Sequence, residues 1–93
     1  MSTITKRYQI EGRVQGVGFS YTTRQIALGF DVIGWIKNLV EGSLELVLEG
    51  EAEGVEEFIL ELTEESPLSH HIKAIHQDTI SELEGVKGFT IIK

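Results

Sequence analysis

The segment from Gly12 to Ser20, GRVQGVGFS, combines a glycine-rich turn with residue types that can hold a phosphate group. Before it, Tyr8 and Ile10 alternate with polar residues as in a half-buried strand, and after it the apolar residues follow helical spacing. Glycines leave the backbone N–H groups of the turn unobstructed, and the start of a helix adds its positive dipole end. Such a turn can bind a phosphate, although a glycine-rich turn can also serve only to reverse the chain.

The histidines His70, His71 and His76 are the next candidates for a chemical role. Adjacent histidines that enter a strand are expected to point to opposite faces, and no cysteine or paired carboxylate completes a ligand set. We therefore expect no functional metal site. Ser20 is not expected to be a nucleophile, because no histidine or lysine is placed by the sequence to activate it.

The composition limits the possible functions. A chain of 93 residues suffices for one small domain, and 41% hydrophobic residues with a single proline indicate a globular fold. The absence of cysteine excludes disulfides and cysteine nucleophiles. The apolar runs are too short for a signal peptide or a membrane span. We expect a cytoplasmic monomer that makes no membrane contact.

The net charge of −7 is unevenly distributed. Residues 1–37 hold five basic and two acidic residues, whereas residues 38–65 hold ten glutamates and no basic residue. The glycine-rich turn thus lies in the basic part of an acidic chain, which favours a small anionic ligand there and disfavours nucleic acid as a partner. Most of the glutamates are expected to form a solvated helix face.

The remaining periodicities predict the elements around these residues. They indicate strands over 6–14, 72–77 and 89–92, helices over 19–28 and 51–64, and a hairpin with arms 31–39 and 43–49. Gly29 is expected to end the first helix in the left-handed conformation, and Ser66–Pro67 to end the second. This order predicts an α+β fold, the ferredoxin-like split βαβ sandwich (βαββαβ), with both helices on one face of an antiparallel sheet and the last strand as a fifth edge strand.

Two blocks of residues resemble the signatures of a known family. Gly-x-Val-Gln-Gly-Val-x-Phe, over residues 12–19, closely resembles the first signature of the acylphosphatase family. Gly-Trp-Ile-Lys-Asn-x-x-Glu-Gly-Ser-Leu-Glu, over residues 34–45, is similar to the second. The two blocks have the family's spacing, and the chain has the family's whole length. The family's first signature ends with an arginine, where this sequence has Ser20.

The resemblance implies the same fold and the hydrolysis of acyl phosphates without a metal or cofactor, so the ligand would be an acyl phosphate or inorganic phosphate. By matching position, the phosphate would be bound by backbone N–H groups of Gln15, Gly16, Val17, Gly18 and Phe19. Asn38 matches the asparagine that orients the attacking water, and its amide can accept one hydrogen bond while donating another. Standing alone, an asparagine before a hairpin turn is usually a turn residue.

The serine at position 20 leaves two function classes open. An arginine there would supply a positive charge and two parallel hydrogen bonds, whereas Ser20 supplies one neutral hydroxyl. Arg24 lies one helical turn further on and is expected on roughly the same face, but such a residue is more often simply solvated. The sequence predicts an acylphosphatase with weakened activity, and the alternative is a non-catalytic module that binds phosphate or another anion.

Overall fold

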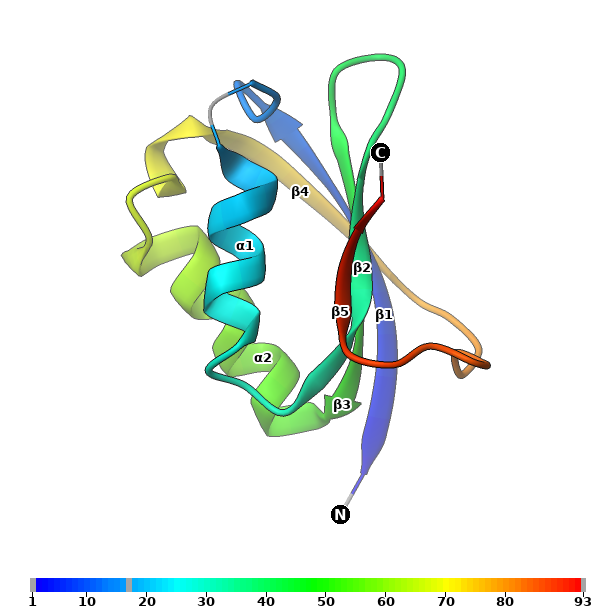
Figure 1. The fold of residues 1–93 in the computed structure, drawn as a ribbon. Coiled ribbons are helices and arrows are strands. Elements are labelled where there is room, and N and C mark those ends of the chain that lie inside the picture. Colours follow the sequence, from blue (N-terminus) through cyan, green and yellow to red (C-terminus); the bar gives the residue numbers. More distant parts are fainter. Residues whose placement is uncertain (1, 17, 93) are drawn as a thin grey trace.

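The computed structural model describes residues 2–16 and 18–92, which form a two-layer sandwich (Figure 1). Within these residues the sheet consists of β1 (Thr3–Gly12), β2 (Val32–Asn38), β3 (Leu44–Glu51), β4 (Ile72–Thr79) and β5 (Phe89–Ile92). The second layer contains α1 (Phe19–Ala27) and α2 (Ala52–Leu60), with a π-helical turn η1 (Glu61–Glu65) after α2 and a 3₁₀ turn η2 (Ser69–His71) before β4. The predicted order of strands and helices is confirmed.

The strands lie in the order β4-β1-β3-β2-β5, which is the ferredoxin-like order with the predicted edge strand added. β3 pairs antiparallel with β1 and with β2, and β4 pairs antiparallel with β1. β5 runs parallel to β2, so the sheet is mixed where an antiparallel one was expected. The reason is topological: residues 80–88 cross one end of the sheet, and β5 begins beside the start of β2 (Figure 1).

The core lies between the sheet and the two helices, which cover the same face of the sheet (Figure 1). α1 packs over β2 and β5, and α2 packs over β1 and β3. The buried side chains of β1 and β3 include Tyr8, Ile10, Leu44, Leu46 and Leu48. Those of the second helical segment include Val55, Phe58 and Leu62. Both sets follow the alternation and the helical spacing predicted from the sequence.

The glycine and proline positions predicted where both helical segments end, but not the conformation of Gly29. α1 ends in a tightened turn in which the N–H of Gly29 donates to the carbonyl of Ile26 at 3.0 Å. Because this turn satisfies the last carbonyls, Gly29 does not adopt the left-handed conformation, and that prediction is wrong. Ser66 before Pro67 ends the second helical segment after η1, as predicted.

The helices are short elements of the sandwich. α1 and α2 have nine residues each. In the part of the chain that the structure describes, no helix is long and apolar enough to cross a membrane.

Candidate active site

The turn after β1 takes its shape from two glycines. Gly16 and Gly18 have φ angles of 77° and 76°, a left-handed conformation that is costly for other residues. A Cβ atom at either position would meet no atom within 4 Å, so the backbone conformation and not crowding requires glycine here. Val17, which the sequence places in the same phosphate-binding turn, lies outside the described residues.

The first turn of α1 directs its backbone N–H groups toward this glycine turn. Gly18 is the N-cap, and its carbonyl accepts the first helical hydrogen bond from the N–H of Thr22 at 3.0 Å. Among the described residues no side chain caps this end, and the first turn contains no acidic residue. The N–H groups of Phe19 and Ser20 therefore have no intrahelical acceptor, and they form the positive end of the helix dipole.

The side chains at the start of α1 contribute in different ways. Phe19 is 1% exposed and belongs to the core, so only its backbone can face a ligand. Ser20 is the second residue of α1 and partly exposed; it does not cap the helix, since Gly18 holds that place. Arg24 lies in the last turn, where the helix dipole favours a cation. The neutral hydroxyl of Ser20 thus occupies the position at which the family's first signature has an arginine, close to the N-terminus of α1.

The glycine turn is anchored through its backbone to η2, directly before β4. A bulge between Glu11 and Gly12 interrupts the β1–β4 pairing, and the N–H of Arg13 donates to the carbonyl of His71 at 3.0 Å. Gly12 has a φ of 139°, and a Cβ atom there would lie 2.2 Å from the same carbonyl oxygen. Because only glycine permits this close approach, Gly12 fixes the point at which the turn leaves the sheet.

The other side of the glycine turn is attached to the β2–β3 hairpin by the side chain of Gln15. Its Nε2 atom donates to the carbonyl of Leu39 at 2.8 Å and to that of Ser43 at 2.9 Å. The same carbonyls close the hairpin turn, accepting from Gly42 N–H at 3.1 Å and from Leu39 N–H at 2.9 Å. The sequence predicts only a backbone role for Gln15, because this contact joins residues 24 and 28 positions apart and no local pattern signals it.

Asn38 belongs to the same end of the molecule. It is the last residue of β2, pairs with Leu44 of β3, and has an exposed side chain. Val32 and Ile36 of β2 are buried beneath the helices, so the alternation of the strand places Asn38 on that face. The end of β2, the glycine turn and the start of α1 are at the same end of the sandwich in Figure 1, and the side chain of Gln15 connects the turn to the hairpin there. The structure thus gathers the glycines, Ser20 and Asn38 at one end of the helix face.

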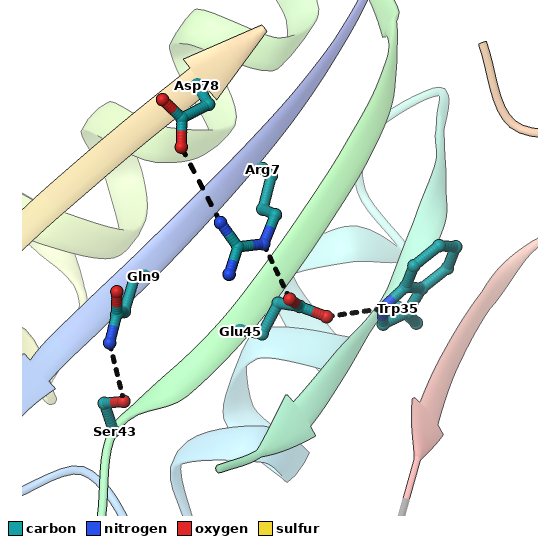
Figure 2. A network of polar contacts seen from close by, with 6 residues as sticks. All are labelled: Arg7, Gln9, Trp35, Ser43, Glu45 and Asp78. Carbon is teal, nitrogen blue, oxygen red and sulfur yellow. Dashed lines mark hydrogen bonds and ion pairs between the residues drawn. The ribbon is translucent and has the colours of Figure 1, made fainter. Parts of the chain in front are cut away.

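The opposite face of the sheet carries a polar network around Arg7 (Figure 2). Arg7 donates from Nε to Glu45 at 2.7 Å and lies 3.6 Å from Asp78, and Trp35 Nε1 lies 3.4 Å from Glu45. The hydrogen bond from Arg7 holds the pKa of Glu45 below its ordinary value, and the hydrogen bond from Trp35 acts in the same direction. The positive charge of Arg7 is therefore engaged on the outer face, away from the glycine turn.

A hollow of about 330 Å³ opens beside the hairpin on this outer face. Its lining includes the carboxylates of Glu11 and Glu41 together with Ser43. Two carboxylates repel an anion, so this hollow is a poor place for a phosphate. The helix side of the same end, with its N–H groups, is the better candidate.

The histidines are arranged differently from the prediction. His70 and His71 lie in η2 and not in a strand, and their ring centroids are 4.2 Å apart, so the side chains lie side by side and do not point to opposite faces. His76 contacts Glu11 through Nε2 at 2.8 Å. Over residues 2–16 and 18–92, no group of three or more histidine, aspartate or glutamate side chains is placed to hold a metal ion.

Comparison with known proteins identifies the family of the chain. A sequence model of the acylphosphatase family matches residues 6–91. The acylphosphatase of Lactobacillus gasseri is 33% identical over 92 residues, covering 99% of each chain. The crystal structure of the Bacillus subtilis acylphosphatase has a TM-score of 0.86 and 32% identity, covering 97% of this chain and 99% of that one. Full-length HypF in its phosphate- and nucleotide-bound form has a TM-score of 0.82 and 29% identity, covering 99% of this chain and 12% of that one. Both the sequence matches and the fold show that the chain belongs to the acylphosphatase family.

Proposed function

We propose that this chain hydrolyses the anhydride bond between a carboxylic acid and phosphate. The observation that carries the proposal is the convergence of the glycine turn, the open N–H groups of α1 and Asn38 at one end of the helix face. The side chain of Gln15 links the turn to the hairpin that follows Asn38. Membership of the acylphosphatase family supports this choice of site, since the two blocks that resemble the family's signatures supply all of these residues.

In the proposed reaction, a water oxygen attacks the phosphorus atom of the bound acyl phosphate. The bond between phosphorus and the carboxyl oxygen breaks, the carboxylate leaves with the electron pair, and the protons of the water pass to phosphate and solvent. A carboxylate is a weakly basic leaving group, so it departs without a general acid. The tasks left to the protein are positioning and stabilisation of charge on the equatorial oxygens.

Each part of the proposed site has one task in this reaction. The backbone N–H groups of the turn hold the equatorial oxygens; they belong to Gln15, Gly16, Val17, Gly18 and Phe19. Asn38 accepts a hydrogen bond from the attacking water and donates another, which fixes the water oxygen in line with the leaving carboxylate. The proposed reaction therefore uses no titratable side chain as a general acid or base.

Ser20 weakens the proposed activity. Its hydroxyl can donate one neutral hydrogen bond, whereas an arginine would add a fixed charge and a second donor. Arg7 does not replace that charge, because it is bound to Glu45 on the other face of the sheet. We therefore propose that this chain hydrolyses acyl phosphates more slowly than it would with an arginine at position 20. If no activity remained, the chain would be a non-catalytic module that binds phosphate.

Hydrolysis of benzoyl phosphate tests this function. We expect the purified chain to release phosphate over many turnovers, and Asn38→Ala to lower kcat by at least about a hundredfold, the range for losing one group aimed at a transition state. Thr90→Ala is the matched control, since Thr90 is also exposed on the strand next to β2 but pairs with Trp35 on the outer face. Its turnover should equal that of the parent.

Three results would change the assignment. Equal turnover in the parent and in Asn38→Ala would remove Asn38 from the mechanism. Absence of hydrolysis, combined with phosphate-dependent NMR shifts of the turn amides, would favour the non-catalytic binding module. Shifts centred on the histidines would place the anion elsewhere and overturn the site itself.

A further inference from the structure

The side chain of Gln15 joins two segments that carry different parts of the proposed site. Its backbone belongs to the glycine turn, and its side chain reaches the hairpin between β2 and β3. Both hydrogens of its amide are used, one on Leu39 at 2.8 Å and the other on Ser43 at 2.9 Å. With both hydrogens committed to fixed carbonyls, this amide holds the turn and the hairpin at a set separation.

The two acceptors are fully used by this arrangement. The carbonyls of Leu39 and Ser43 each accept one hydrogen bond within the hairpin turn and one from Gln15. A carbonyl oxygen has two lone pairs, so the contact completes both acceptors. It is also sheltered, because Ser43 is 5% exposed and Gln15 is half-buried. Hydrogen bonds in such a site are stronger than those in open water.

Gln15 is also fixed from its own side. Val14, directly before it, is 1% exposed in the core, and the N–H of Arg13 donates to the carbonyl of His71 in η2. Gly16, directly after it, begins the left-handed part of the turn. Gln15 is therefore the last firmly held residue before the turn leaves the core. On the other side, its acceptor Leu39 is covalently next to Asn38.

We propose that Gln15 is a positioning residue that sets the separation between the phosphate-binding turn and Asn38, an inference that rests on the proposed function. The side chain acts through the hairpin and does not touch the reacting atoms. A displacement of about 1 Å in such a geometry can cost about a hundredfold in rate. Loss of the contact should lower kcat, while KM changes little because the turn N–H groups remain in place.

Gln9 offers a matched control on the opposite face of the sheet (Figure 2). Its Nε2 atom donates to the side-chain Oγ of Ser43 at 3.2 Å, so it also ties a glutamine amide to the hairpin. It lies within β1, several residues before the glycine turn. A general loss of hairpin stability would appear in Gln9→Met as well as in Gln15→Met.

The first arm of the test compares kcat and KM for benzoyl phosphate in the full chain. Methionine has a similar length to glutamine but no donor, and Gln15→Met should lower kcat about 10- to 100-fold with KM within about threefold of the parent. Gln15→Glu should be at least as slow, because its carboxylate would face two carbonyl oxygens. Gln9→Met should match the parent. A folded Gln15→Met variant with a kcat within about twofold of the parent would overturn the proposal.

The second arm needs no turnover. Isotope-edited NMR follows a titration with inorganic phosphate at the turn amides and at the side-chain amide of Asn38. Both should respond together in the parent, and the turn amides alone should respond in Gln15→Met. An Asn38 response that persists in Gln15→Met overturns the role of Gln15 and leaves the phosphate site intact. A parent whose turn amides do not respond overturns the proposed function and the role of Gln15 with it.

Discussion

The substitution Ser20→Arg measures what the candidate site lacks. Ser20 is the second residue of α1, is partly exposed, and follows the N-cap Gly18. An arginine at this position can extend over the glycine turn without displacing a core side chain. Its guanidinium would offer two parallel donors and a fixed charge to a bound phosphate.

Ser20→Arg is expected to raise the rate of hydrolysis strongly and to lower the free energy of unfolding only a little. One donor aimed at developing charge is worth about a hundredfold in rate, and arginines of other phosphoryl-transfer enzymes contribute about 10³–10⁵. A cation in the first turn opposes the helix dipole at about 0.3–1 kcal/mol, and no acidic residue of that turn offsets it. This cost corresponds to a Tm lower by about 1–8 °C for a domain of this size. We expect kcat/KM to rise at least about a hundredfold.

The assay compares kcat/KM for benzoyl phosphate, because the added charge also attracts ground-state phosphate and part of the gain appears as binding. Tyr21→Arg is the matched control. Tyr21 is the next residue of the same turn and is 63% exposed. Tyr21→Arg therefore adds the same positive charge about 100° further around the helix. Adding Asn38→Ala to Ser20→Arg should abolish the gain, because a bound phosphate without an oriented water does not react.

A well-folded Ser20→Arg variant that is no faster than the parent would refute this reasoning, since the turn would then have diverged at more than one residue. Equal gains in Ser20→Arg and Tyr21→Arg would attribute the effect to general attraction of anions. A gain that survives Asn38→Ala would mean that another group orients the water.

Two titrations test the electrostatics of the sheet. Hydrogen bonds from Thr5 and from the N–H of Leu83 hold the pKa of Glu49 below its ordinary value of 4.5. The ionised Glu49 carboxylate therefore stabilises the fold fully above pH 4.5, and this stabilisation is lost as the pH falls through the lowered pKa. The difference in urea midpoint between the parent and Glu49→Gln should therefore narrow between about pH 7 and about pH 3, and a constant difference would contradict this. Burial, with a smaller effect of Glu56, raises the pKa of Tyr8 to about 12, so the effect of the neutral phenol on stability is complete below pH 10 and lost as the pH rises through 12. Phenolate absorbance should show a step near pH 12 that Tyr8→Phe lacks, and a difference between the two curves that appears near pH 10 instead would show that Tyr8 is not protected.

The sequence predicts most of the fold, because burial in a two-layer sandwich is a local pattern. The alternation of Leu44, Leu46 and Leu48 and the spacing of Val55 and Phe58 are visible within short windows, and each set faces the core. The direction of β5 is not visible in this way. It depends on pairing with β2, a strand more than fifty residues away, so the parallel pair emerges only from the tertiary structure.

The candidate site is predicted less completely, because the resemblance supplies residue types and not contacts. It points to Gly16, Gly18 and Asn38, which the structure places at one end of the helix face. It gives no sign of the Gln15 side-chain contact, since that depends on the hairpin lying beside the turn. The expectation for the histidines fails for a local reason: the chain forms a 3₁₀ turn at His71 before β4 begins.

The glycine turn is held by His71 at its base and by Leu39 and Ser43 at its side. These supports are far apart in the sequence, and they come together only when β1 has paired with both β3 and β4. Pairings between such distant segments form late, because the entropy of closing the loop is lost before the contacts are gained. A phosphate ion at this turn would therefore bind only to molecules in which β1 has paired with both β3 and β4. During refolding, its binding site would emerge after the helices, together with the later of these two pairings.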